Sequence, residues 1–293
     1  MRYRFLRFPG GKPKAVTLSY DDGIIQDERF SDLLQKYNIK CTFNINGKSL
    51  RAPEKDLPDD VIKRCILDRG HEVAVHGLRH KAEGTLRPIS GIRDVLDCRL
   101  DLEKRFGIII RGMAYPDSGI TRFPDNNTNY ETIKNYLKEL DIAYSRTLSG
   151  DNSNFFLPSD WHRWMPTAHH YNPEIFNYIK EFVNIDFNSP KIYGAHRFSR
   201  LFYLWGHSYE FDNEHNGKSG WEHIEKICKE LGGRDDIWYA TNIEIHDYVE
   251  AYHSIRCSAD ETIMYNPTLY TLWFEIDGKS YSINPGETIK VEE

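Results

Sequence analysis

The chain has 293 residues, which is enough for one large domain or two ordinary ones. Hydrophobic residues make up 40% of it and charged residues 28%, the composition of an ordinary globular protein. The formal net charge of -6 and the lack of any basic block argue against nucleic acid and anionic membranes as partners.

The cysteines and the first residues bear on the cellular compartment. The five cysteines are an odd number and no two have CxxC spacing, so we expect neither a disulfide framework nor a thiolate zinc site. The first residues contain no long apolar stretch of the signal-peptide kind, and no run reaches the ~18 apolar residues of a membrane span. We therefore expect a cytoplasmic protein.

Short apolar runs alternate with amphipathic helical patterns as far as residue 255. Gly107 marks the end of one helix, and Thr128 with Glu131 forms a capping-box pattern at the start of the next. We expect strands at 14–20, 40–45, 72–75, 108–110, 142–144, 201–205 and 237–239. We expect helices near 30–37, 59–69, 90–107, 128–140, 172–179, 219–231 and 243–255.

This alternation indicates the fold class. About seven strands separated by helices predict an α/β protein with a parallel sheet. The length and the repetition favour a barrel over an open sheet. The sequence has no GxGxxG pattern, no GxxxxGK[ST] pattern and no internal repeat, which argues against a nucleotide-binding alternative.

The end of the chain has a different pattern. Leu269–Ile276 and Lys279–Ile283 alternate around Asp277-Gly278, a strong hairpin turn signal, and 288–291 reads as another short strand. We expect a barrel over 1–258 and a small β appendage over 262–293. The appendage is expected to pack on the barrel or to form a subunit contact in a homo-oligomer.

Two carboxylates follow the first barrel strand. Asp21 and Asp22 come directly after an apolar run, and Gly23 permits a sharp turn after them. Neighbouring side chains on a strand point to opposite faces, so the backbone must turn if both carboxylates serve one site. Taken alone, the segment also fits an ordinary acidic turn; a site built from both carboxylates would require a cation.

His76 and His80 follow the third predicted strand, four residues apart. The loops after the strands of a βα barrel gather on one face, where active sites lie, so these histidines and the acidic pair are expected to meet. Two imidazoles and one carboxylate form a three-ligand set with open positions, which suits zinc or another divalent first-row metal. The second aspartate would then be free to act as a base beside a metal-activated water.

Four segments resemble the motifs of one family. Thr17–Gly23 resembles the TFDDG motif of the polysaccharide deacetylases with a NodB-type domain, carbohydrate esterase family 4. Val75–His80 is similar to that family's H-[ST]-x-x-H motif, with Gly77 in place of Ser or Thr. Met113–Pro116 resembles its third motif, usually F-R-P-P-Y-G, and Leu204–His207 resembles its last, an apolar strand that ends in histidine. The four occur in the family's order and cover roughly residues 12–250.

The resemblance implies a distorted (β/α)7 TIM-like barrel and a set of residue roles. Asp21 would be the catalytic base, and His207 would protonate the leaving amine. Asp22, His76 and His80 would hold a divalent metal, with zinc as the leading candidate and other first-row metals as alternatives.

The resemblance also implies groups that contact the substrate. The backbone N–H of Asp117, after the third motif, would stabilise the oxyanion, a contribution worth about 3 kcal/mol in such sites. Tyr115 would either contact substrate or pack against the barrel mouth. For the fourth motif, which supplies an aspartate and a tryptophan, Asp160-Trp161 is the best candidate, with Trp164 as a second choice for the tryptophan.

One departure from the family concerns the base. The arginine of the third motif, which orients that base in the family, aligns with Ala114. Arg111, Arg163 or Arg197 could replace it, and the sequence does not decide between them.

The leading hypothesis is a metal-dependent deacetylase that hydrolyses an N-acetyl amide on an amino sugar or an oligo- or polysaccharide. Its partner would be the carbohydrate substrate, with no nucleic acid and no membrane. Two alternatives stay open: hydrolysis of a non-sugar amide such as a cyclic ureide, and a catalytically silent carbohydrate-binding protein. His169 and His170 match no motif and are interpreted as structural or supporting residues.

Overall fold

The centre of the molecule is an eight-stranded sheet whose pairings are all parallel. The computed structural model describes residues 3–47, 54–117, 120, 127–148, 152–187 and 197–291. The long strand β2 lies in the middle, because β8 pairs with one of its edges and β3 and β11 pair with the other. The strands are, in spatial order, β6 (Tyr144–Arg146), β5 (Gly112–Ala114), β4 (Glu72–Val75), β3 (Cys41–Ile45), β2 (Lys14–Asp22), β8 (Arg200–Gly206) and β7 (Ala168–His169), and β11 (Ile237–Tyr239) pairs with the start of β2.

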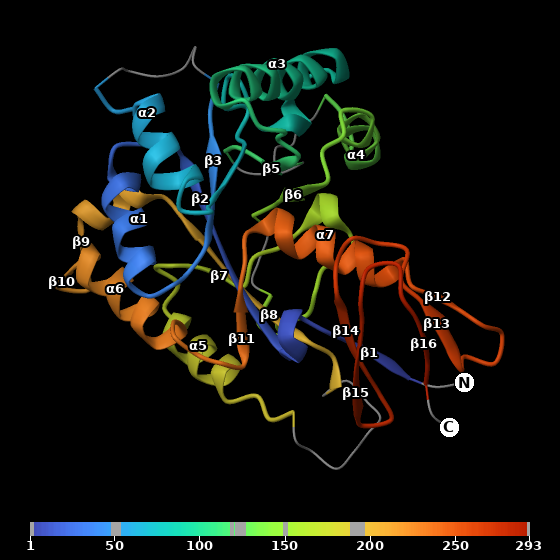
Figure 1. Cartoon of the computed structure of the whole chain (residues 1–293). Helices are drawn as coiled ribbons and strands as arrows, with labels where there is room; N and C mark the ends of the chain where they lie inside the picture. The colour runs from blue at the N-terminus through green and yellow to red at the C-terminus, as the bar shows by residue number, and fades with distance from the viewer. Residues whose placement is uncertain are drawn as a thin grey trace.

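The sheet curves into a distorted barrel (Figure 1). The segment that leads into β7 runs alongside β6: Trp164 donates its N–H to the Ser145 carbonyl at 3.1 Å, and Thr147 donates to the Trp164 carbonyl at 2.9 Å. This segment therefore connects β6 and β7, the strands at the two ends of the spatial order. The predicted α/β class is confirmed, with one short strand, β7, that the sequence did not indicate.

Seven helices lie around the outside of the strands (Figure 1), with their apolar faces turned to the sheet. None of these helices, within the described ranges, has the length and apolarity that crossing a bilayer requires. They are α1 (Gln26–Lys36), α2 (Asp59–Ile62), α3 (Pro88–Phe106), α4 (Tyr130–Glu139), α5 (Ile175–Val183), α6 (Gly220–Leu231) and α7 (Asn242–His253). A π-helical turn, Lys63–Leu67, continues α2, and short 3-10 helices lie at Pro9–Gly11, Glu83–Thr85, Trp161–Arg163 (η5) and Ser208–Asp212 (η7).

Two predicted elements are placed differently. The strand expected at 108–110 lies at 112–114, and Ile109 is 78% exposed, so this apolar run precedes the strand and is not part of it. The expected capping box at Thr128 is wrong, because the side chain of Asn129 caps α4 by accepting the N–H of Thr132 at 3.0 Å. In both cases the true element begins later than the pattern suggested.

The C-terminal strands form two small antiparallel sheets. The expected hairpin consists of β14 (Leu272–Ile276) and β15 (Lys279–Ile283), and Asp277 and Gly278 in its turn have φ of 51° and 81°. β1 (Arg4–Arg7) pairs with β14, so the blue and red ends of the chain lie side by side (Figure 1). The second sheet contains β12 (Arg256–Cys257), β13 (Ile263–Tyr265) and β16 (Thr288–Lys290), and a separate two-stranded ribbon contains β9 (Glu214–His215) and β10 (Lys218–Ser219).

These C-terminal strands pack on the barrel through α7. Phe274 and Ile276 of β14 belong to one apolar cluster with Tyr248 and Val249 of α7. The Tyr248 hydroxyl accepts the backbone N–H of Trp273 at 3.0 Å. Because β1 joins the same small sheet, the start of the chain also contributes to it, and the division at 258–262 remains a prediction.

Glu83 is a buried carboxyl group away from the sheet. It accepts a hydrogen bond from the Tyr136 hydroxyl at 2.5 Å, and its other oxygen finds no partner among the described residues. Burial raises the pKa of Glu83 from 4.5 to about 8, against the hydrogen bond from Tyr136, which lowers it. The folded protein therefore holds a proton here that an unfolded glutamate releases near pH 4.5.

This proton makes stability depend on pH. Between about pH 4.5 and 8 the folded state binds more protons than the unfolded state, so the free energy of unfolding falls as pH rises. Glu83→Gln should remove this slope, which amounts to at most about 1.4 kcal/mol per pH unit. Urea unfolding at pH 5, 6, 7 and 8 measures it, with the exposed Glu131→Gln as the matched control. Parallel curves for Glu83→Gln and the unsubstituted protein would contradict the assignment.

Candidate metal centre and active site

The residues predicted to form the site lie where neighbouring strands end. Asp21 and Asp22 are the last residues of β2, His76 follows β4, and His207 follows β8. All these strands are parallel, so their carboxyl ends open on one face of the barrel. The structure brings these four residues together with His80.

The backbone turns at Asp22 itself. Asp22 has φ of 83° and Gly23 has φ of 65°, so the left-handed turn begins one residue earlier than the glycine. The turn directs the two carboxylates into different surroundings. The Asp21 side chain is 2% exposed, whereas the Asp22 side chain is 24% exposed. A non-glycine residue in this conformation is strained, and such strain is common at functional sites.

Asp22, His76 and His80 form a group with the spacing of metal ligands. The Asp22 Oδ1 lies 3.8 Å from His76 Nε2 and 3.6 Å from His80 Nε2, and both distances exceed the length of a hydrogen bond. His76 donates its Nδ1–H to the Ala114 carbonyl at 2.9 Å, because a carbonyl oxygen can only accept. The Nε2 lone pair of His76 is therefore directed at the other two ligands, which is how a metal-binding histidine is normally held.

A buried aspartate holds the loop between the two histidines. Asp94 of α3 accepts the N–H groups of Leu78 at 3.0 Å and Arg79 at 3.2 Å. Gly77 has φ of 76°, and a Cβ at this position would lie 2.7 Å from Asp94 Oδ2. A serine or threonine, usual in the motif that this segment resembles, would not fit here, so Gly77 and Asp94 form one alternative solution for the loop.

Asp21 is paired with an arginine that the sequence did not single out. The Arg146 Nη2 donates to Asp21 Oδ2 at 2.5 Å, and both side chains are almost fully buried, at 0% and 2% exposure. The Asn44 Nδ2 donates to the other carboxylate oxygen at 2.8 Å. Arg146 ends β6, and it lies in register with Ala114 on the neighbouring strand β5.

The three arginines proposed from the sequence lie elsewhere. Arg111 pairs with Asp247 at 3.2 Å, Arg163 lies over the ring of Tyr130 at 4.4 Å, and Arg197 pairs with Glu275. None of them reaches Asp21, so that prediction was wrong. Arg146 was overlooked because it stands outside every recognisable motif.

The charges around Asp21 keep it ionised. Burial works to raise its pKa, but Arg146, His76 and His207 together outweigh burial, and the pKa of Asp21 lies below its ordinary value. A carboxylate in this state can accept a proton from a reactant near neutral pH.

His207 faces the same carboxylate oxygen of Asp21 as Arg146 does. Its Nε2 is 3.8 Å from Asp21 Oδ2, too far for a hydrogen bond. Burial opposes charging of the ring, but the Glu210 hydrogen bond and the Asp21 charge raise the pKa of His207 above its ordinary value. Trp205, two residues earlier, packs against both groups: its ring lies 5.9 Å from the His207 ring and 4.7 Å from the Arg146 guanidinium.

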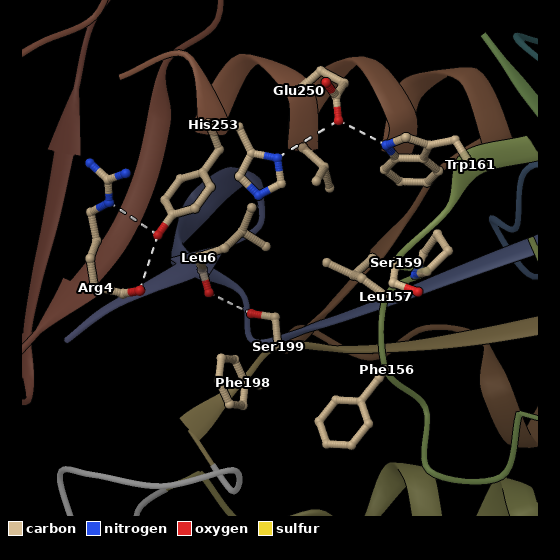
Figure 2. Close-up of a pocket in the computed structure, with 13 residues that line it drawn as sticks. Arg4, Leu6, Phe156, Leu157, Ser159, Trp161, Phe198, Ser199, Glu250 and His253 are labelled. Carbon is tan, nitrogen blue, oxygen red and sulfur yellow. Dashed lines mark hydrogen bonds and ion pairs between the residues drawn. The ribbon is translucent and has the colours of Figure 1, made fainter. Parts of the chain in front are cut away.

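The structure does not bring Asp160 and Trp161 to this group. Asp160 accepts hydrogen bonds from Tyr130 and Lys134, both at 2.7 Å. The Trp161 indole donates to Glu250 at 2.8 Å in a pocket of about 680 Å³ between β1 and α7 (Figure 2). Residues before β8, such as Ser199, line this pocket, so it lies at the opposite end of that strand from His207.

Of the other predicted residues, Tyr115 and Trp164 also pack away from this group. Tyr115 is fully buried and its hydroxyl donates to the His162 carbonyl at 2.9 Å, so it packs in the barrel wall. Trp164, the second choice for the tryptophan, is also fully buried, and it packs on Tyr144 and Tyr203. Asp117 is exposed with φ of 57°, and its role in binding an oxyanion remains a prediction.

A second pocket, of about 470 Å³, opens directly beside the metal-ligand group. Its lining residues are Asp22, Ile24, Ile25, Gln26, Lys55 and Tyr209. The Tyr209 side chain is 44% exposed, and its ring lies 5.1 Å from the His207 ring. This pocket therefore gives a small molecule access to Asp22, and Tyr209 in its wall contacts His207.

Comparison with known families agrees with the motifs. Residues 9–144 match the family model described as polysaccharide deacetylase. This part of the chain is similar to the polysaccharide deacetylase family. The match contains both aspartates and both histidines of the site, and it ends before Arg146 and His207. The predicted enzyme class, a hydrolase of carbon–nitrogen bonds other than peptide bonds, is confirmed at the level of the family.

Solved structures show the same fold over most of the chain. A putative polysaccharide deacetylase from Mycobacterium smegmatis is 17% identical, with a TM-score of 0.55, over 86% of this chain and 96% of that one. The Puue allantoinase is 12% identical, with a TM-score of 0.57, over 84% and 93% of the two chains. At these identities the likeness concerns the barrel alone. No protein with a curated description matches the sequence.

The buried ion pair can be tested by its effect on stability. Arg146→Met should lower the free energy of unfolding of the metal-free protein by about 3–5 kcal/mol, because Asp21 loses the cation that compensates its buried charge. The matched control is Arg111→Met, which breaks a partly exposed pair and should cost less than about 1 kcal/mol. Urea unfolding with a chelator present measures both.

The double variant Asp21→Asn/Arg146→Met sharpens this test. It should recover part of the loss, because the buried charge is then absent. Equal losses of unfolding free energy for Arg146→Met and Arg111→Met would show that the buried Asp21–Arg146 pair stabilises the fold no more than the partly exposed pair does.

Proposed function

We propose that the protein is a metal-dependent deacetylase that hydrolyses the N-acetyl amide of an amino sugar in an oligo- or polysaccharide. One observation carries this proposal: a buried, ionised carboxylate, Asp21, lies 3.7 Å from the ring of His76, one of three convergent metal-type ligands. The match of residues 9–144 to the polysaccharide deacetylase family model supports it.

The donor set fits a divalent cation. Asp22, His76 and His80 would hold it, and two imidazoles with one carboxylate suit zinc while leaving a position open. Asn46 donates to Asp22 Oδ1 at 2.9 Å and Ala114 accepts from His76, so two of the three ligands are oriented by neighbours. When bound, the cation supplies Lewis acidity and lowers the pKa of water.

The protein's own residues supply the proton transfers. Asp21 accepts a proton from the attacking water as the water oxygen bonds to the amide carbon. His207, with its raised pKa, gives a proton to the amide nitrogen as the carbon–nitrogen bond breaks. The products are acetate and a free amine. Arg146 keeps Asp21 charged and fixes the direction of its carboxylate throughout.

The pocket beside Asp22 supports a carbohydrate as the substrate. Its volume of about 470 Å³ is in the usual range for small ligands, and it is open at one side to the solvent-exposed ring of Tyr209. Aromatic faces of this kind cover the apolar faces of sugar rings. Lys55 at the rim adds a cationic donor for hydroxyl or carboxylate groups of a longer chain.

Substitution of the base tests the mechanism. Asp21→Asn keeps the size of the side chain and one acceptor oxygen but cannot take a proton, so it should lower acetate release by at least about a hundredfold. It should still bind one zinc per chain, because all three ligands remain. Acetate assay and elemental analysis measure the two properties, and His76→Ala is the opposite control, which should lose the metal. Full activity of Asp21→Asn would refute the role of Asp21.

A substrate panel separates the proposal from its alternatives. N-acetylated chito-oligosaccharides and peptidoglycan fragments should release acetate, whereas a cyclic ureide should not be opened. Ring opening of the ureide without acetate release would assign the site to non-sugar amides. Glycan binding without turnover in the presence of zinc, cobalt or manganese would indicate a silent binding protein.

A further inference from the structure

A second cluster of histidines around one carboxylate lies next to the candidate metal centre. Glu210 of η7 has three imidazole nitrogens near its Oε2: His169 Nε2 at 3.1 Å, His207 Nδ1 at 3.4 Å and His170 Nε2 at 3.5 Å. His169 ends the strand β7, which pairs with β8 just before His207, and His170 follows it. In composition and spacing, His169, His207 and Glu210 match metal ligands as well as the first group does.

The hydrogen bonds of His169 argue against a metal. The backbone N–H of Tyr171 donates to His169 Nδ1 at 3.1 Å, so this nitrogen carries the lone pair. In a neutral ring the proton is then on Nε2, which points at Glu210 Oε2. His169 therefore has no lone pair to offer a cation. His76 is held in the opposite way, since its Nδ1 donates to a carbonyl and its Nε2 is free.

One oxygen of Glu210 accepts three hydrogen bonds. Its Oε2 accepts the backbone N–H of His207 at 3.0 Å as well as the ring nitrogens of His207 and His169. Burial acts to raise the pKa of Glu210, but these donors outweigh it and hold the pKa well below its ordinary value. Glu210 is therefore an acceptor, and the 3.4 Å contact of His207 Nδ1 with its Oε2 is a hydrogen bond when Nδ1 carries the proton, with Nε2 turned toward Asp21.

His170 closes the back of the cluster. Its ring is fully buried, it contacts the Tyr20 hydroxyl through Nδ1 at 3.3 Å, and burial lowers its pKa well below the ordinary value. A Cβ on Gly206 would lie 1.9 Å from His170 Nδ1, so only glycine lets this ring pack under the strand that leads to His207. The buried, neutral ring therefore packs beside the partly exposed Glu210.

We propose that Glu210 is a positioning residue that fixes the proton of His207 on Nδ1 and directs its Nε2 to the substrate, with His169 holding Glu210 in place. The cluster is thus a hydrogen-bonded support and not a second metal site. The role in turnover rests on the proposed deacetylase function, while the proton positions are a property of the protein without substrate.

The proton positions can be measured directly. In metal-free protein labelled with ¹⁵N-histidine, at a pH where the ring is neutral, His207 should be the Nδ1–H tautomer. Glu210→Gln keeps one acceptor oxygen but replaces the carboxylate by a neutral amide that also carries a donor, so the share of the Nδ1–H tautomer of His207 should fall, whereas Glu210→Asp should keep Nδ1–H. An unchanged tautomer in a folded Glu210→Gln variant would overturn the proposal even if the enzyme proves to be a deacetylase.

Kinetics and metal content complete the test. Glu210→Gln should lower kcat by about a hundredfold with KM changed less than about threefold, and Glu210→Asp should recover most of the loss. The protein and His169→Leu should both bind one zinc per chain. A second zinc that His169→Leu abolishes would show a metal site instead. If Glu210→Gln does not fold, Glu210→Asp and His169→Leu still decide the question, through the tautomer and the zinc count respectively.

Discussion

The site depends on one buried ion pair, between Asp21 and Arg146. A carboxylate that is almost fully buried stays charged only with a cation at contact distance, and Arg146 is that cation. Three strands separate β2 from β6 in the sheet, so the pair crosses the interior of the barrel. It therefore links the two sides of the molecule at the level where the strands end, and the ring of Trp205 supports the guanidinium from β8.

Around this pair the structure arranges two groups of similar chemical composition for different tasks. Both contain histidines and a carboxylate at hydrogen-bond or near hydrogen-bond distances. What distinguishes them is the partner of each Nδ1 atom: a carbonyl acceptor for His76 and a backbone N–H donor for His169. Distances alone would assign a metal to both, whereas the hydrogen-bond partners leave a free lone pair in only one of these two rings.

The sequence predicted well those features that depend on position along a strand. Asp21, Asp22, His76, His80 and His207 all follow apolar runs, and parallel strands bring such positions together. The barrel class followed from the same alternation. The pairing of side chains across the barrel had no such local signal, so Arg146 and Asp94 were missed, although each is a buried charge within hydrogen-bond reach of the site or its loop.

The misplaced support of the histidine has a physical explanation. Asp160-Trp161 has the residue types of a support for the histidine, but η5 directs these side chains to α4 and α7, where Lys134 and Glu250 bind them. The true neighbour of His207 is Glu210, three residues later, because the turn of η7 folds back on the histidine. The sequence indicated that a carboxylate should lie beside the histidine, and only the geometry of the turn shows that this carboxylate is Glu210.

The register between β5 and β6 has a consequence for recognising enzymes of this kind. Ala114 and Arg146 are direct neighbours across two parallel strands, and adjacent strands are only about 4.8 Å apart. An arginine at the paired position of the neighbouring strand can thus reach the same carboxylate. An alanine at the motif position is then no sign of lost activity. Before such a chain is judged inactive, the residue paired with that position on the neighbouring strand should be checked for the arginine.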